Sequence, residues 1–188
     1  NQGYATTTPR FFGQVPQLFR DGTIKLDVAF INCSMPDKDG YVSFGVSADI
    51  TPSAVETAKI IVAQINPLMP FTYGDSIIHT SRLAAMVRVD DPLAETPDIA
   101  PDSNEIRIGE AIAEHIPDGA VLQVGVGTIP NAVLHSLKNH KHLGLHTEAL
   151  TDGMVNLIES GIVDNSMKQV EKGRTVASLA LGTRRLYD

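Results

Sequence analysis

Cysteine is nearly absent from the 188-residue sequence, in which Cys33 is the only one. A single cysteine excludes a disulfide framework within the chain and a cysteine-based zinc site. Long apolar runs are also missing, since no stretch approaches the roughly 18 residues of a membrane span. Basic residues are in deficit: 15 Lys and Arg stand against 22 Asp and Glu, a formal net charge of −7. This balance argues against nucleic-acid backbone binding as the main task.

What remains is an ordinary globular composition, with 43% hydrophobic and 20% charged residues. The length predicts one or two domains and is sufficient to bury a core without staples. Nothing indicates secretion or a membrane partner, so we expect a cytoplasmic protein. The chain begins with Asn1 and ends at Asp188 directly after an apolar run. We therefore expect both ends to be cut from a longer protein.

The first half predicts strands separated by turns. Residues 25–34 are apolar and β-branched, and residues 36–40 (PDKDG) are typical of a turn. The strand expected at 41–47 would then pair antiparallel with the first one. Thr51 as N-cap and Pro52 at the first helical position predict a helix that ends near Ala58. Two further strands are expected, at residues 59–65 and 76–79.

A proline-rich and acidic segment at residues 89–104 is the best domain boundary in the chain. We therefore expect one domain over residues 1–92, a linker over 93–103 and a second domain over 104–188.

The second half predicts alternating helices and strands. A helix capped by Asn104 should bury a face formed by Ile106, Ile108, Ile112, Ala113 and Ile116, and should stop at Pro117. A strand at 120–124, a Gly-rich turn at 125–130 and a helix begun by Pro130 follow. A strand at 144–150, a helix at 154–160 and a strand at 174–181 complete the pattern. This βαβαβ order is typical of an α/β fold with a parallel sheet.

The geometry of such a sheet brings two features together. Ligands bind beyond the carboxyl ends of parallel strands, where Gly125 ends one predicted strand and Glu148 lies near the end of the next. Exposed backbone N–H groups in a glycine turn favour an anion or a polarised carbonyl oxygen, and a nearby carboxylate could act as a base or nucleophile. The spacing alone favours a tight turn and an ordinary surface glutamate over a site, because the third glycine of a dinucleotide fingerprint is absent.

Six segments follow one another over nearly the whole chain: residues 34–41 (SMPDKDGY), 66–75 (NPLMPFTYGD), 118–133 (DGAVLQVGVGTIPNAV), 143–148 (LGLHTE), 152–153 (DG) and 182–188 (GTRRLYD). In this order and spacing they resemble the acetyl-CoA hydrolase/transferase family, in particular its 4-hydroxybutyrate and butyryl/acetyl CoA-transferases.

The resemblance implies a duplicated α/β architecture, of which this chain covers the latter part of one domain and the first part of a second. It implies an acyl-CoA:carboxylate CoA-transferase with acetate or a short-chain or 4-hydroxy acid as acceptor. Glu148 matches the family's nucleophile, which carries a glutamyl-CoA thioester. The residues matching the family's CoA contacts are Gly125, Val126, Gly127, Thr128 and Ile129.

Two alternatives remain at this point: a thioester hydrolase on the same scaffold, and an inactive CoA-binding fragment. Coenzyme A enters as part of the substrate, and no tightly bound cofactor is expected. A homo-oligomer is expected, because metabolic enzymes of this kind are often symmetric assemblies.

Four histidines fall close together, at positions 135, 140, 142 and 146. A metal site is conceivable, but without a nearby cysteine a solvated loop with one strand histidine is the favoured interpretation. His146 lies two residues before Glu148 and so shares its face of the strand. It could tune Glu148 electrostatically or simply be packed.

Overall fold

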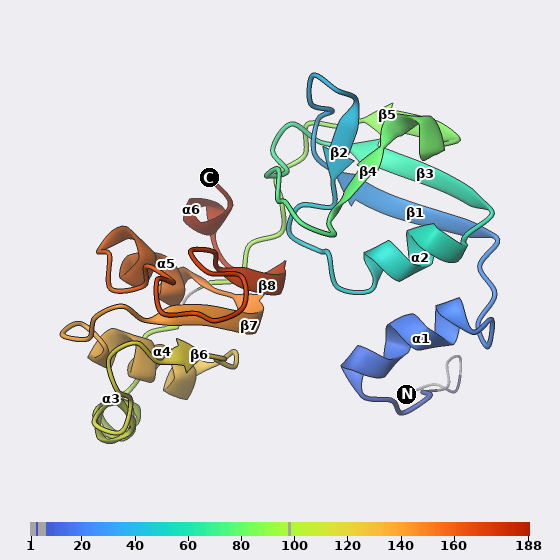
Figure 1. The fold of residues 1–188 in the computed structure, drawn as a ribbon. Coiled ribbons are helices and arrows are strands. Elements are labelled where there is room, and N and C mark those ends of the chain that lie inside the picture. The colour runs from blue at the N-terminus through green and yellow to red at the C-terminus, as the bar shows by residue number, and fades with distance from the viewer. Residues whose placement is uncertain (1–2, 4–6, 98) are drawn as a thin grey trace. The chain divides into compact units, whose positions relative to one another are not determined.

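The computed structural model describes residues 3, 7–97 and 99–188, and the chain divides into two compact units, Asn1–Asp91 and Pro92–Asp188 (Figure 1). The assignment of these units to the end of one CoA-transferase domain and the start of a second stays a prediction. None of the helices in the described ranges has the length and apolarity needed to cross a membrane.

The first unit contains a parallel sheet and a smaller antiparallel pair of strands. Its elements are η1 (Phe12–Gln14), α1 (Val15–Arg20), β1 (Val28–Cys33), β2 (Tyr41–Ser43), α2 (Thr51–Thr57), β3 (Ile60–Ile65), β4 (Ile77–His79), η2 (Thr80–Arg82) and β5 (Ala85–Arg88). The parallel sheet has the order β1-β3-β5, and β2 pairs antiparallel with β4.

The partner expected for the second strand is wrong. β2 pairs with β4, with Val42 opposite Ile78, and does not form a ladder with β1. Val42 and Ile78 belong to the same buried cluster as Ile31 and Ala63 of the parallel sheet. The β2–β4 pair therefore lies on the face of that sheet, where its apolar side chains are removed from water, rather than extending the sheet's edge.

Smaller differences concern element ends. β5 was not expected, because all four of its residues are exposed and give no alternating pattern. α2 begins at Thr51 itself, with Ile50 in the cap position and no side-chain cap. The expected turn at residues 36–40 is present: the Asp37 carboxylate accepts hydrogen bonds from the N–H groups of Asp39 and Tyr41.

In the parallel sheet of the first unit, one face of β1 and β3 is buried and the other is open. The strands β1 and β3 alternate, with Ala29, Ile31 and Cys33 buried on β1. Cys33 is fully buried, and that burial raises the pKa of its thiol to about 12. It acts as a small core residue, as expected. The open face carries Phe30, whose exposed fraction is 80%, together with Val28 and Ile60.

The second unit has the expected βαβαβ order. Its elements are α3 (Ser103–Ala113), β6 (Val121–Leu122), α4 (Thr128–Ser136), β7 (Gly144–Leu150), α5 (Asp152–Glu159), β8 (Val176–Ala180) and α6 (Arg184–Tyr187). The strands form a parallel sheet in the order β6-β7-β8. This confirms the α/β class. Leucines 134, 137, 143 and 145 with Met154 and Leu157 form the centre of its core.

The starts of α3 and α4 differ from those expected. Asp102, not Asn104, caps α3, in a reciprocal capping box with Glu105. α4 begins at Thr128 after the cap residue Gly127, so Pro130 occupies its third position rather than its first. Proline is tolerated in the first turn because its missing N–H has no partner there.

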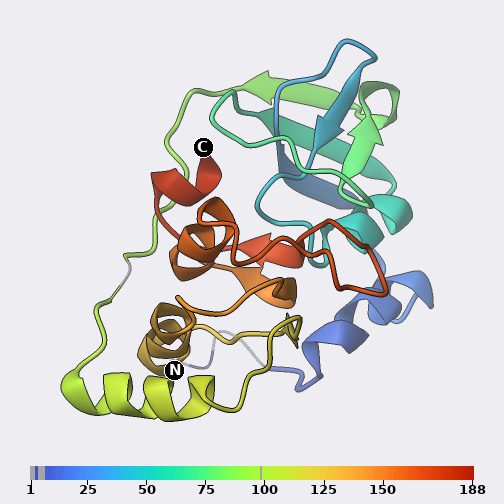
Figure 2. The same cartoon turned by 60° about the vertical axis from the view of Figure 1, so that its left-hand side comes forward.

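The packed face of α3 also differs. Ile106, Ile108 and Ile112 are exposed, whereas Gly109 and Ala113 are buried. α3 runs beside α4 (Figure 2), and a Cβ at position 109 would lie 2.5 Å from the carbonyl carbon of Ala132. The small residues therefore form the contact because they alone permit this close approach, and the isoleucines remain outside it.

Candidate functional site

The glycine loop follows β6 at the carboxyl end of the sheet in the second unit. Gly127 has a φ of +139°, which L side chains rarely adopt, and its carbonyl accepts the N–H of Asn131 in α4. Gly125, Val126 and Gly127 are exposed, as is Ile129. The first N–H groups of a helix have no partner within it, so this exposed loop and the start of α4 can offer donors to an anion or a developing oxyanion.

Thr147 connects this loop to β7. Its side-chain oxygen accepts the N–H of Val124 at 3.2 Å, and its hydroxyl donates to the Val124 carbonyl at 3.0 Å. The residue is buried, with an exposed fraction of 4%. The start of the glycine loop is therefore held next to the residue that precedes Glu148.

Glu148 lies on the open face of β7. Leu145, Thr147 and Ala149 point into the core, while His146 and Glu148 alternate with them and are exposed. His146 is thus not packed in this structure. β6 and β7 are adjacent and parallel, with Leu122 paired to Leu145; Gly125 comes three residues after the first of these and Glu148 three residues after the second. The strand order therefore places the predicted nucleophile position and the glycine loop at the same rim.

The neighbouring strands continue this polar face. Thr147 pairs with Ala177 and Ala149 with Leu179, so Ser178 lies beside Glu148 on β8. Leu122 pairs with Leu145, so Gln123 lies beside His146. All four polar side chains are exposed, and none makes a hydrogen bond or ion pair within the described part of the chain. Parallel sheets usually bury apolar residues on both faces, so a polar face indicates a site.

The end of β8 is fixed at the same rim by Asp152, the first residue of α5. Its carboxylate accepts the Thr183 N–H at 2.7 Å and the Thr183 hydroxyl at 2.8 Å. A Cβ at position 182 would lie 2.5 Å from the Asp152 carboxylate, so glycine is required there. The loops after β7 and β8 are therefore joined beyond the strand ends.

A buried lysine supports the other end of β7. The Lys168 ammonium donates to the carbonyls of Leu145 at 2.8 Å and Arg174 at 2.6 Å, and burial lowers its pKa. Asn165 accepts the Leu145 N–H at 2.9 Å. These bonds attach residues 164–174 to the strand that carries Glu148. Thr147, Asp152 and Lys168 are supporting residues that the sequence pattern did not predict. Asp152 lies in a matching segment that could have indicated it, and nothing in the pattern distinguishes Lys168.

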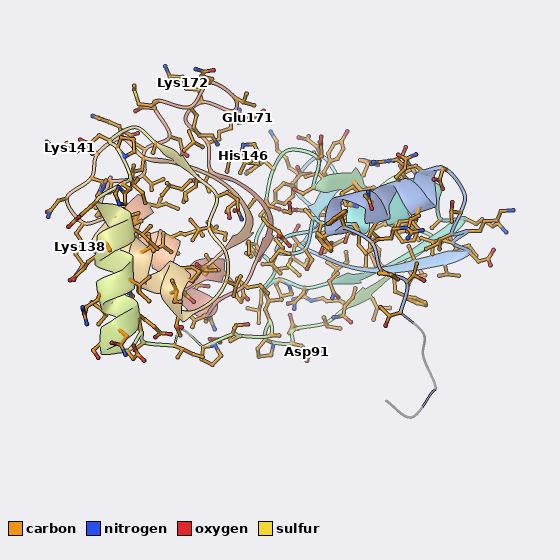
Figure 3. All side chains as sticks on the ribbon, turned by 90° about the horizontal axis from the view of Figure 1, so that it is seen from below. Asp91, Lys138, Lys141, His146, Glu171 and Lys172 are labelled. Carbon is orange, nitrogen blue, oxygen red and sulfur yellow. The ribbon has the colours of Figure 1, made fainter. Side chains whose placement is uncertain are left out.

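The four histidines do not form one site. His142 pairs with Asp164 at 2.7 Å, and the Ser166 backbone N–H, followed by His142, lowers the pKa of that carboxyl to about 2. His135 and His140 line a cavity of about 760 Å³ between α3 and the later part of α4. His146 lies apart from the segment 138–141, which contains His140 and is marked by the labels of Lys138 and Lys141 (Figure 3). Across the described ranges, no three His, Cys, Asp or Glu residues are grouped to hold a metal ion.

Comparison with known proteins adds independent information. The family model for the acetyl-CoA hydrolase/transferase N-terminal domain matches residues 1–99. The chain is 46% identical over its whole length to 4-hydroxybutyrate coenzyme A transferase of Clostridium kluyveri, covering 44% of that protein. It is 44% identical over its whole length to the succinyl-CoA:acetate/propanoyl-CoA:succinate CoA transferase of Fasciola hepatica, covering 39% of it.

Among solved structures, 4-hydroxybutyrate CoA-transferase from Porphyromonas gingivalis matches 94% of the chain with a TM-score of 0.89 and 46% identity. The chain covers 45% of that structure. It thus spans less than half the length of the curated relatives above.

Proposed function

The chain belongs to the acetyl-CoA hydrolase/transferase family, and on that premise we propose that its protein transfers coenzyme A between an acyl-CoA and a carboxylic acid. The observation that carries the proposal is the position of Glu148. Glu148 is exposed on a polar sheet face, and the exposed glycine loop follows the neighbouring strand β6. A nucleophile and donors for an oxyanion are the two parts that acyl transfer requires.

The first half of the reaction moves CoA from the acyl group to Glu148. The Glu148 carboxylate attacks the thioester carbonyl, the carbon–sulfur bond breaks, and CoA leaves as a thiolate, so that a mixed anhydride between Glu148 and the acyl group remains. The thiolate then attacks the Glu148 carbonyl of that anhydride. The product acid leaves as a carboxylate, and a glutamyl-CoA thioester remains. The backbone N–H groups of residues 125–128 stabilise the developing oxyanions.

The second half reverses these steps with a different acid. The acceptor carboxylate attacks the glutamyl thioester, and the thiolate returns to the new acyl group, which regenerates Glu148. A carboxylate is a weak nucleophile in water, so the bound substrate must exclude water from the open face and hold its carbonyl within reach. Gly125, Val126, Gly127, Thr128 and Ile129 are the proposed CoA contacts.

A short-chain acid is the proposed acceptor. The relatives named above are described as acting with 4-hydroxybutyrate in one case, and with succinyl-CoA, acetate and propanoyl-CoA in the other. Acids of this size differ by a few atoms, and one methylene in a pocket is worth about 1–3 kcal/mol. A preference among them therefore depends on few contacts.

The test replaces Glu148 in the full-length protein. Glu148→Gln keeps the shape and removes the charge, and we expect acyl-CoA:acetate exchange to fall by at least about 10³-fold, because the covalent step is lost. Glu114→Gln, at an exposed glutamate that follows α3, is the control and should keep full exchange. Exchange that survives Glu148→Gln would refute the proposal.

The same assay separates the alternatives. A transferase turns over acyl-CoA only when a carboxylate acceptor is present, whereas a hydrolase turns it over in water alone. A CoA-binding protein without activity would bind CoA and give no hydroxylamine-sensitive enzyme thioester.

A further inference from the structure

The two strands beside β7, β6 and β8, stop pairing with it at different residues. β6 pairs with β7 only at Val121↔Gly144 and Leu122↔Leu145, whereas β8 stays paired as far as Leu150. Beyond Leu122, the contact between the chain and β7 passes to a side chain. The backbone N–H and carbonyl of Val124 both bond to the hydroxyl of Thr147.

Because a side chain takes the place of the backbone ladder here, the spacing between the two chain segments changes. A backbone ladder brings adjacent strands to about 4.8 Å, whereas a hydroxyl group interposed between them holds the chains further apart. The glycine loop thus starts away from β7 and still at a defined position. Thr147 has one hydroxyl hydrogen, which Val124 and the Ala149 carbonyl share at 3.0 and 3.3 Å.

We propose that Thr147 is a positioning residue whose hydroxyl sets the distance and orientation of the glycine loop relative to Glu148. The inference rests on the proposed function, because it needs Glu148 as nucleophile and the loop as CoA contact. Thr147 is buried and has no contact with substrate in this scheme. It acts through Val124: a thioester held by the loop has its carbonyl within reach of Glu148 only while that anchor is in place.

A purely structural role of Thr147 predicts a different response to substitution. A buried position that only needs filling accepts valine, which has nearly the same shape as threonine, whereas an anchor needs the hydroxyl. The chain contains a matched control at the end of the same strand. Thr151 is also buried, with an exposed fraction of 8%, yet its hydroxyl has no hydrogen-bond partner among the described residues.

The experiment compares Thr147→Val, Thr147→Ser and Thr151→Val in the full-length protein. It measures kcat, the KM for acyl-CoA and the single-turnover rate of glutamyl-thioester formation per folded site. We expect Thr147→Val to lower kcat and the single-turnover rate by about 10- to 100-fold, since small misplacements of reacting groups cost up to 10²-fold. KM should change little because the loop keeps its own donors. Thr147→Ser should restore the rate, and Thr151→Val should leave it unchanged.

Two results would overturn the inference. One is a Thr147→Val enzyme whose single-turnover rate matches the wild type. The other is a Thr147→Ser enzyme as slow as Thr147→Val, which would show that the hydroxyl alone does not hold the loop in place. If Thr147→Val fails to fold, Thr147→Cys replaces it, because a thiol of similar size is a weak hydrogen-bonding group. Equal rates for the Ser and Cys variants would then refute the anchor.

The outcome for Glu148 keeps the two proposals distinct. An inactive Glu148→Gln together with a fully active Thr147→Val refutes the anchor and leaves the proposed function standing. An active Glu148→Gln refutes the proposed function itself.

Discussion

The two units contain sheets of the same construction and opposite surface chemistry. Each has three parallel strands, and one face is buried on β1 and β3 in the first unit and on β7 in the second. The open face in the first unit is largely apolar, with Val28, Phe30, Ile60 and Val87 exposed on it. The open face in the second unit carries Gln123, His146, Glu148 and Ser178.

The difference shows that strand order alone does not make a site. Burial stabilises a fold by about 25 cal/mol for each Å² of apolar surface removed from water. Apolar side chains that stay exposed therefore add nothing to stability. Polar side chains lose little there and can bind a polar substrate. The same backbone therefore carries an exposed apolar face in one unit and a candidate catalytic face in the other.

The largest expected effects concern the buried faces, which both sheets have. Ile61→Ala in β3 and Leu145→Ala in β7 should each lower the free energy of unfolding by about 2–5 kcal/mol, because both remove methyl groups from a packed core. Chemical denaturation measures both. Labelling of Cys33, the only cysteine, reports the first unit separately, and hydrogen exchange of the β7 amides reports the second. A loss below 1 kcal/mol in one unit would break the comparison, because its face would then not be packed.

A smaller effect is expected on the polar face. Ser178→Val places an apolar group beside Glu148, and should reduce CoA exchange by about fivefold, the value of one hydrogen bond of about 1 kcal/mol. Stability should not fall, because the residue is exposed and valine favours strands. Ser178→Thr retains the hydroxyl and serves as control. If Ser178→Val leaves CoA exchange unchanged, Ser178 does not belong to the site, and the part of the polar face that serves exchange does not extend beyond Glu148 toward β8.

The smallest effect is expected on the apolar open face. Phe30→Ala should change the free energy of unfolding of this chain by no more than about 0.5 kcal/mol, because Phe30 is mostly in water. Phe44→Ala is the matched control: Phe44 is 2% exposed, and its loss should cost about 3–5 kcal/mol. Thermal or urea unfolding of the two variants measures the contrast. A cost of several kcal/mol at Phe30 would show that this face is covered in solution.

Much of the second unit was predictable because its signals are local. Strand β7 has the expected bounds, residues 144–150, since an apolar run ends there at a helix start. The glycine loop was also expected, because the glycines of residues 125–130 are typical of a turn, and Gly127 has a φ of +139° that other residues rarely adopt. The position of α4's start was wrong by two residues: proline is tolerated anywhere in a first turn, so Pro130 does not specify which position it takes.

The errors in the first unit have another origin. A short strand such as β2 carries no information on its partner, and the choice of β4 depended on burying Val42 and Ile78 against the parallel sheet. β5 was missed for a related reason, because its exposed residues are held by pairing with β3 rather than by a pattern of their own.

Periodicity, turn residues and motif spacing therefore specified the α/β class, the strand that carries Glu148 and the loop before α4, because each depends on neighbours within a few residues. Tertiary structure alone decided that Thr147 bonds to Val124, 23 residues away, and that Lys168 is buried against Leu145. Such contacts depend on which strands lie side by side and where one of them ends. That outcome is set by the packing free energy of the whole unit, to which a single hydroxyl or ammonium group adds only a small part.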